Sequence, residues 1–206
     1  MPYKAILFDL DGVLVNMPAG HYQALNKALG HFGVEIGEEE HQRVFNGLPT
    51  RKKIEILETQ NRLPRGLGEL VNSIKQKYTK EIMASYCAPE HEKILMLHHL
   101  KNWGYKLGCC SNSVRETLDL MLTSSNLLGY FDLVLGNDDV KNPKPDPEIY
   151  LEAFKRLSVS PEESVIVEDA PHGIAAAIAS GARVLEVRGV EDVNLGLFKD
   201  VLNLQI

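Results

Sequence analysis

Short apolar runs and amphipathic stretches alternate along most of the chain. Each apolar run is bounded by polar or turn-forming residues, which is typical of a buried strand. The runs cover residues 4–8, 106–111, 132–135, 164–167 and 183–187. The later runs are separated by segments with apolar residues at helical spacing, at 91–103, 113–122, 147–157 and 173–180. This alternation predicts an α/β fold, in which a parallel sheet has right-handed crossovers and helices on both faces.

The stretch after the first strand has a different pattern, with no convincing strand between residues 15 and 86. We expect helices at 19–32 and 38–45, a third that begins with Thr50 as its N-cap, and a fourth at 67–84. The side chains expected to face inward in the last two are Ile54, Ile56, Leu57, Leu70, Val71, Ile74, Tyr78 and Ile82.

These helices would form one insert within the α/β core. The insert would span residues 16–87, and its length of about 70 residues is enough for a small bundle. The core would then be discontinuous, with segments 1–15 and 88–206. Two chain crossings between core and insert suit a cap that opens and closes as a rigid body.

Composition narrows the classes of partner. The chain has 206 residues, of which 44% are hydrophobic and 24% charged, and its formal net charge is −6. This acidic balance argues against a protein that binds nucleic acid or an anionic membrane through general charge. No apolar stretch approaches the ~18 residues that span a bilayer, and the first strand leaves no room for a signal peptide.

Cysteine usage points to a reducing compartment. The chain has three cysteines, an odd number, and the adjacent Cys109 and Cys110 fit neither a disulfide framework nor a zinc site. A reactive thiol at Cys110 is the alternative, but two small buried strand residues explain the pair better. We expect a cytoplasmic monomer.

Polar residues that can carry chemistry follow four of the apolar runs. Asp9 and Asp11 end the first, where alternate residues point the same way and two like charges need a cation or proton between them. Ser111 ends the second, just before a predicted helix N-terminus that could bind an anion, whereas Ser113 fits a plain N-cap. The alternative interpretation of Asp9 and Asp11 is a pair of solvated loop acids without a catalytic role.

The other two strand ends complete the set. Lys144 stands between prolines, which fix its backbone, although an exposed loop before the next helix explains that segment equally well. Glu168 and Asp169 close an apolar strand, where paired acids are costly without a cation. Oxygen ligands favour Mg²⁺, and a lysine with backbone amides favours a phosphoryl group. The four strand ends therefore predict a magnesium and phosphate site.

These segments resemble the four motifs of the haloacid dehalogenase superfamily, in order and with fitting spacing. The matching sequences are DLDGVL at 9–14, SN at 111–112, KPDP at 144–147 and EDAPHG at 168–173. The resemblance covers essentially the whole chain, including a helical cap inserted after the first motif. It implies a Rossmann-like core and a branch that contains sugar-phosphate phosphatases and β-phosphoglucomutase-like enzymes.

The resemblance also implies roles for individual residues. Asp9 would be the nucleophile that takes the phosphoryl group as an aspartyl phosphate, and Asp11 the general acid and base. Mg²⁺ would be held by the Asp9 carboxylate, the Asp11 backbone carbonyl and Asp169. The remaining groups implied at the site are Ser111, Asn112 and Ser113 for phosphoryl oxygens, Lys144 for charge neutralisation, and Glu168, which would orient Lys144 or a metal-bound water.

Departures from related families rank the activities. Asp11 argues against a dehalogenase or a phosphonatase, because both lack this second acid. A phosphonatase also uses a cap lysine as a Schiff base, but Lys52 and Lys53 are expected on a polar, solvated helix face. His21 and Arg51 fall where β-phosphoglucomutases have a cap histidine and a substrate-binding arginine.

Two other positions weaken the mutase interpretation. Val114 stands where those mutases have a lysine, and Asn16 where they have an aspartate. We therefore expect a Mg²⁺-dependent phosphatase of a small phosphorylated metabolite, with a mutase as the alternative. Among non-enzymes, a receiver domain is disfavoured by the order of the motifs. A phosphate-binding pseudo-enzyme is disfavoured because the catalytic carboxylates and the lysine are all present.

Overall fold

The computed structural model describes residues 3–83 and 85–203, and the chain divides into two compact units. One unit consists of Met1–Asn16 and Cys87–Ile206, and the other of Met17–Tyr86. We call them the α/β unit and the helical unit. The division lies one residue inside the predicted insert at each end.

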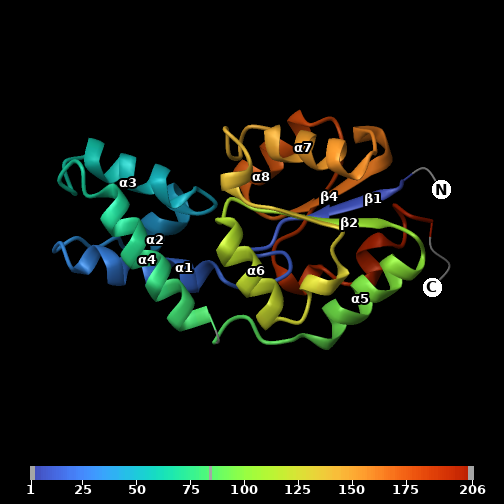
Figure 1. Ribbon diagram of the computed structural model, residues 1–206, viewed down its shortest axis with the longest axis horizontal. Helices are drawn as coiled ribbons and strands as arrows, with labels where there is room; N and C mark the ends of the chain where they lie inside the picture. The colour runs from blue at the N-terminus through green and yellow to red at the C-terminus, as the bar shows by residue number, and fades with distance from the viewer. Residues whose placement is uncertain (1–2, 84, 204–206) are drawn as a thin grey trace. The chain divides into compact units, whose positions relative to one another are not determined.

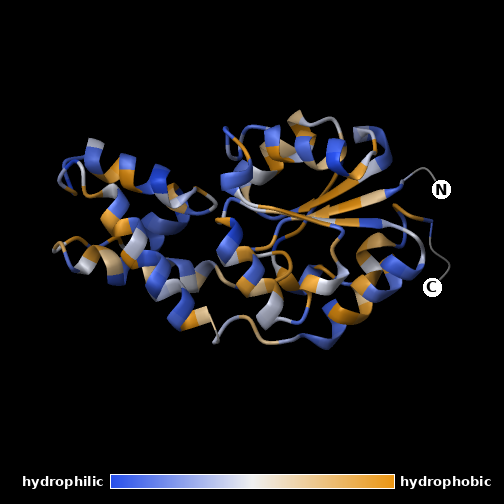
Figure 2. Ribbon diagram, viewed as in Figure 1, coloured by the Kyte–Doolittle hydropathy of each residue, from blue (hydrophilic) through white to orange (hydrophobic). Residues whose placement is uncertain are grey.

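The α/β unit is built on a parallel sheet with the strand order β3-β2-β1-β4-β5. The strands are β1 Ala5–Phe8, β2 Lys106–Cys110, β3 Leu133–Leu135, β4 Ser164–Glu168 and β5 Arg183–Glu186. The central strand β1 is buried over its whole length, and Figure 2 shows the middle of the sheet as mainly hydrophobic. Strands covered on both faces need a continuous apolar run, which is why the sequence pattern located them well.

Helices cover both faces of this sheet, so the predicted fold class is confirmed (Figure 1). α7 and α8 lie over one face, and α5 and α6 lie over the other. Their bounds are α5 His91–Asn102, α6 Arg115–Ser124, α7 Glu148–Leu157 and α8 Pro171–Ala179. Short 3₁₀ segments connect the elements: η2 Leu128–Tyr130, η3 Asn137–Asp139, η4 Pro161–Glu163, η5 Val190–Asp192 and η6 Leu195–Phe198.

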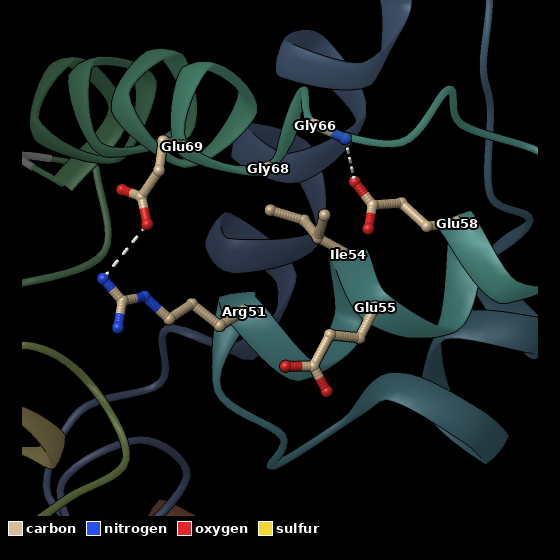
Figure 3. A pocket seen from close by; sticks show the side chains of 7 residues that line it. All are labelled: Arg51, Ile54, Glu55, Glu58, Gly66, Gly68 and Glu69. Carbon is tan, nitrogen blue, oxygen red and sulfur yellow. Dashed lines mark hydrogen bonds and ion pairs between the residues drawn. The ribbon is translucent and has the colours of Figure 1, made fainter.

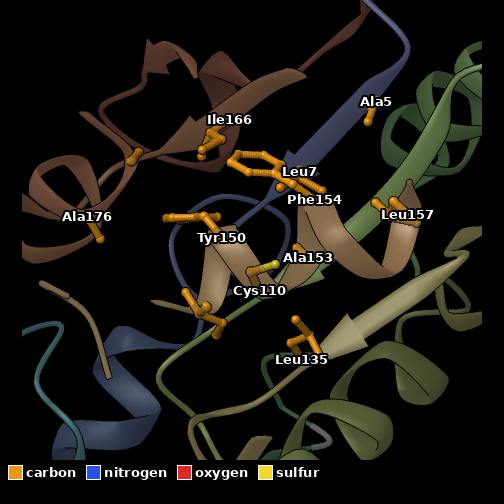
Figure 4. Close-up of a cluster of buried hydrophobic side chains, with 12 residues drawn as sticks. Ala5, Leu7, Cys110, Leu135, Tyr150, Ala153, Phe154, Leu157, Ile166 and Ala176 are labelled. Carbon is orange, nitrogen blue, oxygen red and sulfur yellow. The ribbon is translucent and has the colours of Figure 1, made fainter. Parts of the chain in front are cut away.

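A hydrophobic cluster joins α7 and α8 to the sheet (Figure 4). Leu7 of β1 and Ile166 of β4 pack there with Tyr150 and Phe154 of α7. Because this cluster fixes α7 against the strands, it also fixes the loop that precedes α7, which carries Lys144.

The helical unit has a hydrophobic core of its own. Its elements are α1 Pro18–Gly30, α2 Glu38–Glu40, the π-helical segment η1 His41–Phe45, α3 Thr50–Thr59 and α4 Gly68–Met83. Buried residues from these elements, Leu29, Phe45, Leu57 and Val71 among them, form one cluster. Within residues 17–83 and 85–86 the structure contains no strand, as the sequence pattern predicts. The last residue of the predicted fourth helix, Ala84, lies outside the described residues.

Three expectations for the helical unit are wrong. Pro49, not Thr50, is the N-cap of α3, and no side chain caps that end. Leu70 is 51% exposed instead of facing inward, because it lies on the outer face of α4 beside the buried Val71. Lys53 is buried at 8% exposure, although α3 looks polar around it.

Across the described part of the chain, no helix is both long and apolar enough to cross a membrane.

Candidate active site

The sheet register brings three of the predicted strand ends together. Phe8, the last residue of β1, pairs with Cys109 of β2 and with Val167 of β4. Asp9, Ser111 and Glu168 therefore lie at the same carboxyl edge, where open α/β sheets place their ligands. Asp9 and Glu168 are 8% and 1% exposed, so the site is a buried one.

Lys144 connects two of these strand ends. Its ammonium donates to Asp9 Oδ1 at 2.7 Å, to Glu168 Oε1 at 2.5 Å and to the Cys110 carbonyl at 2.8 Å. Burial alone would lower the pKa of Lys144, but Asp9 and Glu168 raise it well above its ordinary value. The lysine therefore stays a cation at the centre of the site. The alternative of an exposed loop lysine is excluded by its 3% exposure.

Glu168 is occupied on both oxygens by hydrogen-bond donors. Oε1 accepts from Lys144 and from the Tyr150 hydroxyl at 2.6 Å, and Oε2 accepts from the Asp169 amide at 3.2 Å. One oxygen each of Asp9, Glu168 and Asp169 lie within 4.8 Å of one another, so the three could share a cation. Both Glu168 oxygens already accept hydrogen bonds, so Glu168 is better suited to binding Lys144 than to binding a cation. Asp9 and Asp169 are the better candidates for cation ligands.

One structural observation indicates that Asp169 is suited to binding a cation. Its Oδ1 is buried and has no hydrogen-bond partner among the described residues. Burial, together with the charges of Glu168 and Asp11, raises the pKa of Asp169 to about 7. Burial and neighbouring carboxylates also raise the pKa of Asp9 well above its ordinary value, although Lys144 opposes this. A bound divalent cation would relieve both effects, so the donor set suits Mg²⁺.

Asp11 points toward the loop after β2. Its Oδ2 accepts a hydrogen bond from the Ser113 hydroxyl at 3.2 Å, and the Ser113 amide donates to Ser111 Oγ at 3.1 Å. Ser113 therefore connects the first motif to the second, through its hydroxyl on Asp11 and its amide on Ser111. Ser113 is not the helix N-cap that it resembles in the sequence, since Val114 occupies that position.

The start of α6 is already capped by a distant residue. The Arg115 amide donates to Asp138 Oδ1 at 2.8 Å, from η3. The predicted anion site at this helix N-terminus therefore has one amide fewer to offer than a free helix end would.

Asn112 has a role that the sequence did not indicate. Its side chain accepts from the Lys144 amide at 3.0 Å and donates to the Lys144 carbonyl at 3.1 Å. These two bonds hold the lysine backbone against the end of β2, in addition to any contact that the Asn112 amide makes with a ligand. No local sequence pattern could have shown this, because the two residues are far apart along the chain.

The cysteines are buried, as the sequence indicates for the adjacent pair. Cys87, Cys109 and Cys110 are all free and buried. Burial raises the pKa of Cys87 and of Cys110 to about 12, and that of Cys109 well above its ordinary value. Since the thiolate is the nucleophile, none of the three is an activated thiol.

His21 and Arg51, the predicted substrate contacts, belong to the helical unit. Nδ1 of His21 lies 3.3 Å from the ammonium of Lys75, which is buried. Arg51 borders a pocket with three glutamates, and its guanidinium bonds Glu69 at 3.1 Å (Figure 3). Both partners of this ion pair are largely exposed, so the pair contributes little to stability.

The helical unit also buries basic groups that the sequence did not single out. The Lys53 ammonium lies 3.5 Å from Nε2 of His41, and both residues are buried. Burial, and then the charge of Lys53, lowers the pKa of His41 to about 4. His41 is therefore neutral at physiological pH and can accept a hydrogen bond from the lysine.

Comparison with known proteins identifies the family. The model for haloacid dehalogenase-like hydrolases matches residues 6–187. A phosphorylated carbohydrates phosphatase from Thermotoga maritima is 32% identical over 180 residues, which are 86% of this chain and 82% of that protein. A fructose-1-phosphate phosphatase from Escherichia coli is 27% identical over 188 residues, which are 90% of this chain and 97% of that protein.

A solved structure confirms the fold. The crystal structure of a β-phosphoglucomutase from Clostridium difficile superposes with a TM-score of 0.83 at 23% identity, covering 98% of this chain and 97% of that one. At this identity the likeness concerns the fold alone. Together with the match over residues 6–187, it confirms the resemblance that the four motifs indicate, and the chain belongs to the haloacid dehalogenase-like hydrolases.

Proposed function

We propose that this protein is a Mg²⁺-dependent phosphatase of small phosphorylated metabolites, with sugar phosphates as the favoured substrate class. The observation that carries the proposal is the Lys144 ammonium, buried and bonded to Asp9 at 2.7 Å. A carboxylate that must attack an anionic phosphate needs a fixed cation beside it, because the like charges would otherwise repel. The phosphatase relatives from Thermotoga maritima and Escherichia coli support the same substrate class.

The residues of the α/β unit supply the steps. Asp9 attacks phosphorus to form an aspartyl phosphate, and the leaving oxygen takes a proton from Asp11. Asp11 then removes a proton from the water that cleaves the acyl phosphate, which releases phosphate and restores Asp9. Ser111, Ser113 and the Asn112 amide bind phosphoryl oxygens, and Lys144 offsets the charge shared by Asp9 and the phosphate.

Asp9, Asp169 and the backbone carbonyl of Asp11 would hold the metal ion. The unpartnered Asp169 oxygen supports this assignment. When bound, Mg²⁺ supplies positive charge that orients a phosphoryl oxygen and draws charge from it. The helical unit would serve as the cap, with His21 and Arg51 contacting the part of the substrate that leaves.

Variants of the two motif aspartates test the proposal. Asp9→Asn should lower turnover of p-nitrophenyl phosphate to below about a hundredth of the wild-type value, because an amide is a poor nucleophile. Asp11→Asn should turn over about 10²–10⁴-fold more slowly yet bind Mg²⁺ and beryllofluoride nearly as the wild type does. Asp200→Asn, at an exposed acid of the same unit, is the control.

Two outcomes would refute these assignments. An active Asp9→Asn protein would exclude the covalent mechanism. Loss of metal binding in Asp11→Asn as complete as in Asp169→Ala would exclude a purely proton-transferring carboxyl at Asp11. Phosphate release over a panel of phosphorylated metabolites would then identify the substrate.

A sugar-phosphate mutase is the second candidate, because His21 and Arg51 fall where β-phosphoglucomutases have a cap histidine and a substrate-binding arginine. Val114, at the N-cap of α6, places an apolar side chain where a second cation would help to hold a bisphosphate. We therefore expect water to take the phosphoryl group from Asp9, with steady release of inorganic phosphate. Interconversion of a sugar 1-phosphate and 6-phosphate with little phosphate release would reverse this order.

A further inference from the structure

Tyr150 connects the hydrophobic core to the catalytic groups. It lies near the start of α7, is fully buried, and packs in the cluster that contains Leu7 and Ile166 (Figure 4). Its hydroxyl donates to Glu168 Oε1 at 2.6 Å. A phenylalanine would fill the same apolar space, so packing alone does not require the hydroxyl.

Tyr150 contacts both members of the ion pair beside Asp9. The Glu168 oxygen that accepts from its hydroxyl also accepts from Lys144 at 2.5 Å. The Lys144 ammonium lies 4.9 Å from the centroid of the Tyr150 ring, within the range of a cation–π contact. One side chain therefore restrains the carboxylate through its hydroxyl and the ammonium through its ring.

The hydroxyl affects how Lys144 divides its charge between two carboxylates. The ammonium is bonded to Asp9 on one side and to Glu168 on the other. A hydrogen bond from Tyr150 satisfies part of the negative charge on Glu168 and weakens its hold on Lys144. More of the lysine charge is then available to Asp9 and to a phosphoryl group that arrives there.

We propose that Tyr150 is a positioning residue for the reaction, which acts through Glu168 and keeps the Lys144 ammonium on Asp9. The proposal rests on the proposed function, because it assumes that Asp9 is the attacking group. It differs from a purely structural role in what it predicts for the Phe variant, which keeps the packing and loses the hydroxyl.

The kinetic test compares Tyr150→Phe with Tyr105→Phe. Tyr105 is also buried in the α/β unit, but it precedes β2, at the edge of the sheet opposite the site. With p-nitrophenyl phosphate and Mg²⁺, Tyr150→Phe should lower kcat by about tenfold, because a misplaced Lys144 stabilises the transition state less well. KM should change by less than about twofold, and Tyr105→Phe should leave both constants within about twofold of wild type.

A structural readout separates this proposal from the proposed function. In a crystal structure of Tyr150→Phe, the Lys144 ammonium should shift toward Glu168 and lose its hydrogen bond to Asp9. A kcat equal to that of Tyr105→Phe, or a Lys144 that stays on Asp9, would overturn the positioning role. If the wild-type protein released no phosphate from any ester, the proposed function would fail, and the crystal structure would still decide what Tyr150 holds.

Discussion

At the scale of single residues, two glycines make the carboxylate site possible. A Cβ atom on Gly12 would lie 2.1 Å from Asp169 Oδ2, and one on Gly173 would lie 2.0 Å from Glu168 Oε1. Real atoms do not approach so closely, so each acid occupies space that any other residue would fill. Gly12 also has a φ of +90°, which other residues rarely adopt. The glycines of the first and fourth motifs are thus explained by the carboxylates beside them.

We predict that Gly173→Ala lowers kcat by about a hundredfold, because the new methyl group displaces Glu168 and with it Lys144. The backbone of Gly173 is helical, so the substitution introduces no backbone strain, and the loss of activity should exceed the loss of stability. Gly129→Ala, where a Cβ meets nothing within 4 Å, is the matched control. Steady-state kinetics and urea unfolding of the two variants measure both effects. An unchanged kcat in Gly173→Ala would contradict the packing argument.

At the scale of elements, helix starts depend on partners that are distant in sequence. α6 begins two residues later than its serine-rich start suggests, and its first amide is capped by Asp138 from η3. Gly136 allows this contact, because a Cβ there would lie 2.6 Å from Asp138 Oδ1. The cap therefore also fixes η3 to the start of α6.

We predict that Asp138→Ala lowers the free energy of unfolding by about 1 kcal/mol, as for the loss of other helix caps. Asp138→Asn keeps an acceptor oxygen and should retain most of the stability. Urea unfolding followed by circular dichroism measures the difference. Equal stability of the alanine variant and the wild type would show that water replaces the cap.

The difference between local sequence patterns and contacts that are distant in sequence explains what could be predicted. The strands were located to within a residue or two, because β1, β2 and β4 are buried and mainly apolar. The expected site residues Asp9, Ser111 and Glu168 meet because parallel strands end at one edge, and Lys144 reaches them from the loop before α7. The contacts of Asn112 and Tyr150 could not be foreseen, because one looks like a turn residue and the other like a core residue, and their partners are distant in sequence.

At the scale of the whole molecule, each of the two units has a hydrophobic core of its own. The proposed metal ligands Asp9, Asp11 and Asp169 all belong to the α/β unit. Asp169 has a pKa raised to about 7, so without a cation the folded protein holds a proton there at a pH where the unfolded chain has lost it. That contribution to stability is complete below the unfolded pKa and is lost as the pH rises through about 7.

We predict that Mg²⁺ binds more tightly as the pH rises from about 6 to about 8, because a proton on Asp169 competes with the cation. Calorimetric titration in buffers of different ionisation enthalpy should detect proton release below about pH 7 and little above it. Asp169→Asn should weaken binding and reduce its pH dependence, which Asp9 would then carry alone. An affinity that is equal at both ends of this range would show that no raised carboxyl pKa governs the site.

The position of β1 has a consequence for the order of events during synthesis. β1 is the central strand, and its partners Lys106 and Ser164 are made about a hundred residues or more after Ala5. The strand Ala5–Phe8, entirely apolar, therefore leaves the ribosome with neither neighbour available. The helical unit, whose contacts lie within one continuous segment, can fold in the meantime. β1 is thus a segment that needs protection from aggregation until its partner strands have been made.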